Sequence, residues 1–151
     1  MCRILILYTK DDTTESLTFS QIVDFLFLNL DEFGDCKSAI SKSIEYALSP
    51  DNGTGGFVVT AVKDSELVGV VVINKTGMSE YIPENILVYI ATHREHRGSG
   101  IGKLLMNKTL AVVQGDIALH VEYDNKTAIG LYEKLGFESK YIEMRRATCQ
   151  N

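Results

Sequence analysis

The chain has 151 residues, of which 45% are hydrophobic and 23% are charged, and its formal net charge is −5. This length predicts one domain, residues 1–151, with a buried core. The negative charge argues against non-specific binding to nucleic acid or to an anionic membrane, since both require a basic surface. The opening run, MCRILILYTKDD, is too short for a secretory signal, and no stretch approaches the roughly 20 apolar residues of a membrane span.

The three cysteines, Cys2, Cys36 and Cys149, are widely spaced, odd in number and form no CxxC pair. This pattern predicts reduced thiols in a cytoplasmic protein. His93 and His96 lie close together, but the third histidine is distant and no cysteine is near any of them. We therefore expect no metal site.

The first third of the chain predicts one strand followed by two helices. Residues 3–9, RILILYT, form a β-rich apolar run ended by charges, which indicates a buried strand. Thr18 and Gln21 have the spacing of a capping box, so we expect a helix over residues 19–33, although its phenylalanines and leucines also suit a strand. Residues 36–48 carry apolar side chains on one stripe and predict a second helix.

The middle of the chain predicts three strands. The β-rich runs 57–62 and 67–74 are joined by KDSE, a connection short enough for an antiparallel hairpin. Residues 86–92, ILVYIAT, are continuously apolar, as expected for a strand at the centre of a sheet.

The last third predicts a helix to about Val113, a strand over residues 117–123 and a helix beginning at Asp124 or Asn125. Residues 136–148, GFESKYIEMRRAT, predict one or two closing strands. The order of these elements indicates a single α/β domain.

The segment HREHRGSGIGKLL connects the central strand to a helix and contains three glycines at alternate positions. A glycine inside a helix costs about 1 kcal/mol relative to alanine, so such a run indicates a requirement for bare backbone. N–H groups at a helix N-terminus bind anions, and glycines allow a phosphate to approach them. Arg97 and Lys103 add positive charge, and an arginine can bind phosphate oxygens through two N–H groups.

Three phosphate-loop patterns contain glycines at similar spacings. A P-loop requires serine or threonine after the lysine, but Leu104 follows Lys103. The dinucleotide pattern GxGxxG fails because the third glycine is misplaced. The pattern R-x-x-G-x-G is filled by Arg97, Gly100 and Gly102, with Gly98 as an extra glycine. A plain glycine-rich turn without a ligand is the alternative.

THREHRGSGIGKLL resembles motif A of the GCN5-related N-acetyltransferase (GNAT) superfamily, and DNKTAIGLYEKLGF resembles its motif B. The resemblance covers Ile86 to about Phe137, whereas the first 50 residues match only in the order of their elements. The residues of the second segment at family positions are Asn125, Ala128, Leu131, Tyr132, Leu135, Gly136 and Phe137.

The resemblance implies a mixed α/β fold with a mostly antiparallel central sheet and about four helices on its faces. A V-shaped cofactor cleft would split the sheet between residues 86–92 and 117–123. Acetyl-CoA would lie in this cleft as the co-substrate, with its pyrophosphate on the glycine loop. The implied cofactor-binding residues are the backbone donors Arg97, Gly98, Ser99, Gly100, Ile101 and Gly102, with Lys103 beside them, and Ile90, Ala91 and Thr92 along the pantetheine arm.

Two residues lie at motif B positions, Asn125 and Tyr132, and each can have either of two roles. Asn125 matches a position that often contacts the cofactor, and it would also cap the following helix. Tyr132 matches a tyrosine that often donates to the departing sulfur, and a phenol with a pKa near 10 is a donor at neutral pH. The alternatives are capping alone for Asn125 and helix packing alone for Tyr132.

The base that accepts the proton of the amine is less clearly marked. Glu84 lies 13 positions before Arg97, close to where some family members place a glutamate. It follows a proline at a loop–strand junction, so a solvated loop charge is the alternative. Tyr89, His93 and a chain of water molecules are further candidates.

These features predict an acetyl-CoA-dependent N-acetyltransferase in which a primary amine attacks the thioester directly. The acceptor is a small molecule or a protein amine, and the carboxylates Glu80, Glu84 and Glu122 favour a cationic one. A non-catalytic acyl-CoA-binding sensor or interaction module is the alternative function. The prediction includes no metal, nucleic acid or membrane partner, and the resemblance also allows a homodimer.

Overall fold

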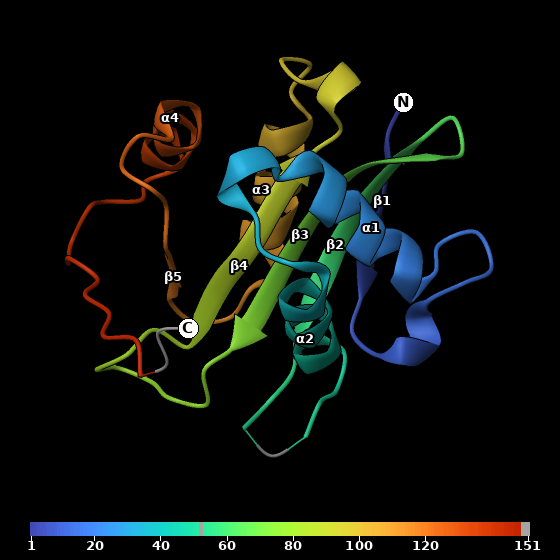
Figure 1. The fold of residues 1–151 in the computed structure, drawn as a ribbon. Helices are drawn as coiled ribbons and strands as arrows, with labels where there is room; N and C mark the ends of the chain where they lie inside the picture. The colour runs from blue at the N-terminus through green and yellow to red at the C-terminus, as the bar shows by residue number, and fades with distance from the viewer. Residues whose placement is uncertain (52, 149–151) are drawn as a thin grey trace. The chain divides into compact units, whose positions relative to one another are not determined.

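A computed structural model describes residues 1–51 and 53–148 and has a mixed α/β architecture (Figure 1). The strands are β1 (Arg3–Leu7), β2 (Gly56–Lys63), β3 (Glu66–Lys75), β4 (Asn85–Thr92) and β5 (Ile117–Leu119). The α-helices are α1 (Phe19–Asn29), α2 (Lys37–Ala47), α3 (Ile101–Val112) and α4 (Lys126–Lys134), with 3₁₀ turns at Lys10–Asp12, Asp31–Phe33 and Arg94–His96. The chain forms two compact units, Met1–Leu119 and His120–Asn151.

The sheet of the first unit has the order β1-β2-β3-β4-β5. The pairs from β1 to β4 are antiparallel, and β5 joins β4 in parallel. The predicted hairpin is confirmed, and Asp64 and Ser65 form its turn with φ values of 51° and 64°. Two successive positive φ values are typical of a type I′ turn, whose twist matches that of the strands it joins. The predicted mixed, mostly antiparallel sheet is therefore confirmed.

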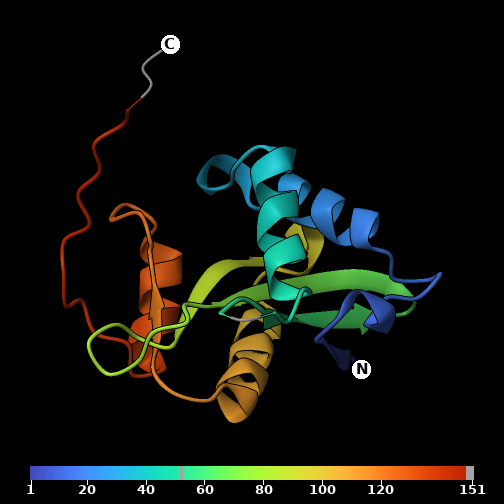
Figure 2. The ribbon, with the colours of Figure 1, turned by 90° about the horizontal axis from the view of Figure 1, so that it is seen from below.

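Helices cover both faces of this sheet: α1 and α2 lie on one side and α3 on the other (Figure 2). The capping box at the start of α1 is confirmed, because Thr18 N–H donates to Gln21 Oε1 at 2.8 Å and Gln21 N–H to Thr18 Oγ1 at 3.1 Å. The core under α1 and α2 consists mainly of Ile22, Leu26, Ile40, Ile44, Val58, Val70, Val72, Tyr89 and Ala91.

A β-bulge lies in the middle of β4. Val72 pairs with Tyr89, whereas the next residue of β3, Ile73, pairs with Leu87, so Val88 is the extra residue. Pairing with β5 includes only Asn85–Leu87 and ends where the bulge begins. A bulge bends and twists its strand, and the β4 edge after Val88 has no paired strand among the described residues of the first unit. The predicted V-shaped cleft between these two strands stays a prediction, because β5 itself ends at Leu119.

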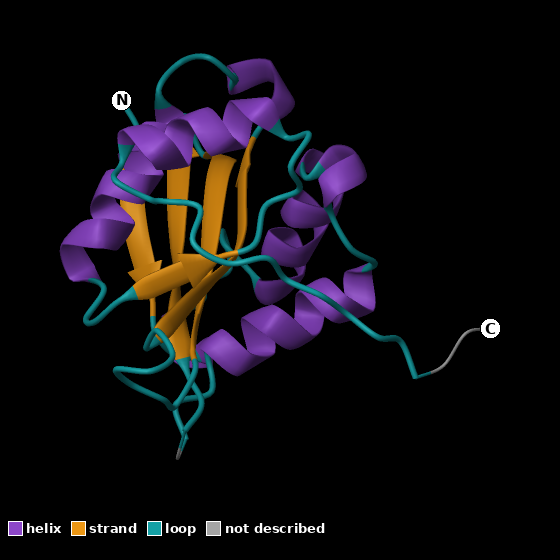
Figure 3. Cartoon of the chain, turned by 90° about the vertical axis from the view of Figure 1, so that its left-hand side faces the viewer, coloured by secondary structure: helices purple, strands orange, loops and turns teal. Residues whose placement is uncertain are grey.

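The two predictions for the C-terminal strands differ from the structure. The strand expected over residues 117–123 is only Ile117–Leu119, and the closing strands expected in 136–148 are wrong, since the described part of this segment is loop (Figure 3). Tyr141, Ile142 and Met144 are each 89% exposed. A strand is stable only when it is paired with another strand. Residues 136–148 have no partner strand in the described part of the second unit, so their β propensity alone does not produce a strand.

Two other expectations concern the cysteines and membrane insertion. Cys2 and Cys36 carry free thiols, while Cys149 lies outside the described residues. Across residues 1–51 and 53–148, no helix has the length and apolar character needed to cross a bilayer.

Gly69 of β3 lies where α3 packs closely against the sheet. A Cβ there would be 2.6 Å from Leu105 Cδ1 and 3.0 Å from Ile101 Cγ2. We expect Gly69→Ala to lower the free energy of unfolding by about 1–3 kcal/mol, because the added methyl group overpacks this contact.

Gly130→Ala is the matched control for this prediction. Gly130 is inside α4 and an added Cβ would have no heavy atom within 4 Å, so alanine should raise stability by up to about 1 kcal/mol through helix propensity. Urea unfolding of both variants measures the difference. Equal stability of Gly69→Ala and the wild type would contradict the observed packing of α3.

Candidate functional site

The glycine loop, residues 97–100, connects the 3₁₀ turn after β4 to α3. Gly98 and Gly100 have φ values of 79° and 88°, in the left-handed region that favours glycine. A Cβ at either position would meet no heavy atom within 4 Å. The loop backbone therefore faces open space, and a ligand can approach it without displacing a side chain.

The N-terminus of α3 carries N–H groups with no intrahelical partner. Gly100 is the N-cap residue and makes no side-chain cap hydrogen bond, and the first turn contains no acidic residue. The first intrahelical bond runs from Leu104 N–H to Gly100 O at 3.0 Å. The amides of Ile101, Gly102 and Lys103 therefore point out of the helix, where the helix dipole favours an anion.

The guanidinium of Arg97 points to the end of α1. Its Nη1 donates to Asp31 Oδ2 at 2.9 Å and its Nη2 to the backbone oxygen of Asn29 at 2.8 Å. The sequence suggested that this charge stands beside a phosphate. In the structure its side chain is instead part of the contact between the glycine loop and α1.

The open edge of β4 presents alternate backbone groups. His93 N–H donates to Val68 O at 2.8 Å, so its backbone faces β3. Because backbone groups alternate along an antiparallel strand, Ala91 also faces β3, while Ile90 and Thr92 face the edge that β5 leaves open. Of the three residues expected to bind the pantetheine arm, Ile90 and Thr92 have the suitable orientation.

Tyr89 is buried, and its hydroxyl donates to Asp35 Oδ2 at 2.5 Å. Burial, followed by the neighbouring Asp35, raises the pKa of Tyr89 above its ordinary value of 10. The phenol is protonated at neutral pH, which disfavours Tyr89 as the base for the amine.

Glu84 directly precedes β4 and lies at the end of that strand opposite the glycine loop. Its carboxylate packs against Gly115 in the α3–β5 loop, where an added Cβ would overlap it. The strand has eight residues, and at about 3.3 Å per residue they separate Glu84 from the loop by roughly 25 Å. As a base, Glu84 would serve the end of β4 that is paired with β5.

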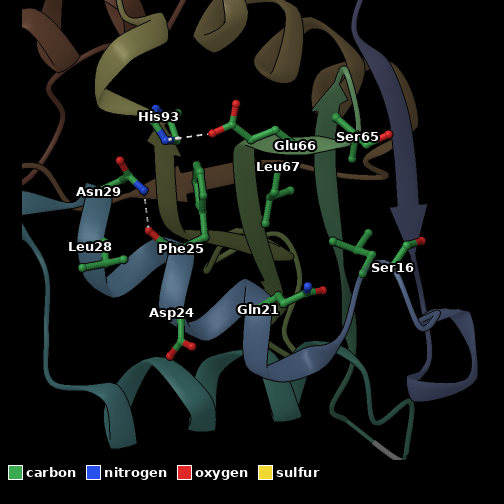
Figure 4. A pocket seen from close by; sticks show the side chains of 12 residues that line it. Ser16, Gln21, Asp24, Phe25, Leu28, Asn29, Ser65, Glu66, Leu67 and His93 are labelled. Atoms are coloured by element: carbon green, nitrogen blue, oxygen red, sulfur yellow. Dashed lines mark hydrogen bonds and ion pairs between the residues drawn. The ribbon is translucent and has the colours of Figure 1, made fainter.

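His93 and His96 share one carboxylate. Glu66 Oε1 is 3.3 Å from His93 Nε2 and Glu66 Oε2 is 3.7 Å from His96 Nε2. His93 also lines a pocket of about 320 Å³ between α1 and the β2–β3 hairpin (Figure 4). No residue of the glycine loop lines this pocket, and its Glu66 and Asp24 are paired with side chains of the protein. Within the described ranges, no three His, Cys, Asp or Glu side chains form a metal-binding group.

The second unit contains Asn125 and Tyr132. Asn125 is the N-cap of α4, and its Oδ1 accepts a hydrogen bond from Ala128 N–H at 3.4 Å, so the capping role is observed. Tyr132 is buried and its ring lies 5.7 Å from that of Phe137, centroid to centroid. Burial raises the pKa of Tyr132 to about 12, which keeps its phenol a proton donor at neutral pH. The cofactor roles of both residues stay predictions.

Asn29, Asp31 and Asp35 were not singled out by the sequence. They contact residues between 54 and 68 positions away in the chain. No motif or periodicity connects positions so far apart. The only signal was the opposite charge of the segments DEFGD and REHR.

The model of the acetyltransferase (GNAT) family matches residues 22–137. This span covers most of the chain and includes the glycine loop, the bulged strand and α4. The chain therefore belongs to the GNAT acetyltransferase family.

Relatives with sequence similarity include human N-alpha-acetyltransferase 30, which is 33% identical over 81 residues. That match covers 51% of this chain and 22% of the human protein, so the chain corresponds to about a fifth of that relative.

Solved structures with the same fold include a ribosomal-protein-alanine N-acetyltransferase from Brucella melitensis, with a TM-score of 0.64 and 18% identity over 97% of this chain and 99% of that one. An aminoglycoside acetyltransferase from an uncultured soil sample has a TM-score of 0.66 and 14% identity, covering 98% and 97% of the two chains.

Proposed function

We propose that this chain transfers the acetyl group of acetyl-CoA to an amine. The observation that carries the proposal is the N-terminus of α3, where free amides and two left-handed glycines face open space beside the unpaired edge of β4. A pyrophosphate fits this arrangement because it needs several N–H donors, a favourable dipole and room for its oxygens. A non-catalytic acyl-CoA-binding module is the alternative.

The proposed cofactor contacts follow the backbone. The pyrophosphate binds the amides of the glycine loop and the first turn of α3, with the Lys103 ammonium nearby. The pantetheine arm extends along β4 and pairs with Ile90 and Thr92, as an added strand would. The complete set proposed is Ile90, Thr92, Arg97, Gly98, Ser99, Gly100, Ile101, Gly102, Lys103 and Asn125, and it leaves out Ala91 because the backbone of Ala91 faces β3.

The proposed reaction removes two protons from the acceptor nitrogen and gives one to the departing sulfur. The acceptor ammonium first loses a proton, and its nitrogen then attacks the thioester carbonyl, forming the C–N bond as the C–S bond breaks. Tyr132 would donate its phenolic proton to the departing thiolate. The second proton of the nitrogen would leave through solvent as the amide forms, and solvent would return a proton to Tyr132. Glu84, His93 or a water chain would accept the proton of the ammonium. The raised pKa of Tyr89 makes it a poor candidate for this role.

The first acceptor to test is the α-amine of a peptide. The likeness to N-alpha-acetyltransferase 30 supports this class, while the fold alone also occurs in an aminoglycoside acetyltransferase. A single working domain, a cytoplasmic location and a homodimer stay predictions from the sequence.

The direct test is release of free thiol from acetyl-CoA in the presence of amine panels. Peptides with free and blocked N-termini, lysine side-chain peptides, diamines and aminoglycosides should be compared, with product mass as the second readout. We expect turnover with a free peptide N-terminus and none with its blocked form. Binding of acetyl-CoA without turnover on any amine would favour the non-catalytic module.

Gly100→Ala tests the glycine loop. Alanine at a φ of 88° is strained, and its methyl group projects into the space where a phosphate would bind. We expect coenzyme A to bind at least tenfold more weakly, equivalent to about 1.4 kcal/mol. Gly53→Ala is the matched control, since Gly53 has a φ of 84° and equally open surroundings in another loop. If calorimetry shows that both variants bind coenzyme A with equal affinity, the proposal that the pyrophosphate binds this loop is wrong.

Tyr132→Phe tests the proposed proton donor. The ring and its packing on Phe137 are kept, so coenzyme A affinity should change little. Turnover should fall by about 10²-fold, the size typical of acid–base catalysis, with kcat and kcat/KM falling together. Steady-state kinetics with the best acceptor measures this, and turnover within about threefold of wild type would assign the proton to another donor.

A further inference from the structure

One carboxylate joins the end of α1 to the segment that leads into the glycine loop. Asp31 Oδ1 accepts a hydrogen bond from Arg94 Nε at 3.0 Å and forms an ion pair with Arg94 Nη2 at 2.8 Å, and its Oδ2 accepts from Arg97 Nη1 at 2.9 Å. Asp31 has a φ of 55°, which is uncommon for a residue other than glycine. The hydrogen bond from Arg97 lowers the pKa of Asp31, so the carboxylate is charged at neutral pH.

Asn29 adds backbone contacts to the same connection. Its Oδ1 accepts from Arg94 N–H at 3.1 Å, and its backbone oxygen accepts from Arg97 Nη2 at 2.8 Å. Its Nδ2 donates to Phe25 O at 2.9 Å within α1, and the side chain is buried. Residues 94–97 are therefore bonded to a helix end that is itself part of the core.

The loop beyond Arg97 has few contacts of its own. Gly98 and Gly100 have no side chains, and an added Cβ at either would touch nothing. Ser99 Oγ donates to His96 O inside the same segment. Glycine backbone is conformationally permissive, so the geometry of the loop depends on its two ends. One end is α3, which is packed by the buried Ile101 and Leu105, and the other is Arg97.

We propose that Asp31 is a positioning residue that, through Arg94 and Arg97, holds the glycine loop in the conformation that presents its amides to the cofactor's pyrophosphate. This inference rests on the proposed function for the identity of the ligand. The arginine of the R-x-x-G-x-G pattern then acts mainly by fixing the loop, and the backbone amides bind the phosphate.

Asp31→Asn separates positioning from simple electrostatics. The substitution removes a negative charge near the proposed phosphate site, which alone would strengthen binding of an anion. A positioning role predicts that the substitution weakens anion binding. We expect coenzyme A to bind five- to twentyfold more weakly, while pantetheine, which lacks the pyrophosphate, binds as it does to the wild type.

Asp24→Asn is the matched control, because Asp24 lies on α1, seven residues before Asp31, and is also in an ion pair at the surface, with Lys37 at 3.0 Å. It makes the same chemical change without a contact to the loop. Exposed ion pairs contribute little to global stability, so both variants should melt close to the wild type. Affinity for coenzyme A should be lost only in Asp31→Asn.

Amide ¹⁵N relaxation of Gly98 and Gly100 in the ligand-free protein gives a readout that does not depend on the cofactor. We expect order parameters near those of rigid backbone in wild type and Asp24→Asn, and a clear decrease in Asp31→Asn. Unchanged order, or coenzyme A affinity equal to or tighter than wild type, would overturn the positioning role. Failure of the wild type to bind coenzyme A would refute the proposed function, while the relaxation data would still decide whether Asp31 orders the loop.

Discussion

The extra residue in β4 is the constraint on which the arrangement of the first unit depends. Up to Leu87, β4 pairs with β5, and beyond Val88 the same edge is unpaired in the described residues. On its other side, β4 pairs with β3 before and after the bulge, with a shift of one residue at Val88, through to Thr92. The β4–β5 pairing thus ends beside the bulge, at the last residue of β5, while β4 remains attached to β3. An unpaired edge inside a fold is costly unless another group satisfies it, which is why a ligand that pairs like a strand suits this position.

The glycine loop and α3 occupy the end of this open edge. Close packing at Gly69 brings the first turn of α3 against β3, and hydrogen bonds from residues 94 and 97 attach the preceding segment to α1. The two faces of the sheet therefore meet at the loop: α3 belongs to one face and α1 to the other. This explains how the glycine loop can be held at both ends although neither of its two glycines has a side chain to pack.

The elements that the sequence predicted well are those with a local cause. Hydrophobic periodicity, the Thr18 capping box and the short KDSE connection each depend on residues within a few positions. The start of α1, the helix α2 and the hairpin formed as predicted, whereas α1 ends at Asn29 and not at Phe33. The closing strands failed because strand formation depends on a partner, which residues such as Ile142 cannot specify. The spacing of Arg97, Gly100 and Gly102 predicted an anion-binding site, because it matches a phosphate-loop pattern. The partners of Arg97 and Tyr89 were not predictable, since Asp31 and Asp35 lie on a loop far away in the chain.

The charges around the loop explain why an acidic residue is compatible with a phosphate site. Asp31 is shared by Arg94 and Arg97, so the three side chains together carry a formal charge of about +1. The dipole of α3 adds further positive potential on the side where the amides point, and Lys103 adds a positive charge in the first turn of this helix. Asp31 therefore orients the side chains of Arg94 and Arg97, and the electrostatic potential at the proposed pyrophosphate site stays positive. Arginine suits this contact because its planar guanidinium keeps several donors in a fixed geometry. Arg97 binds a carboxylate and a backbone oxygen at the same time, and these two bonds also restrain the backbone of Arg97. A lysine at either position would supply the same charge but could not hold the loop through two directed contacts.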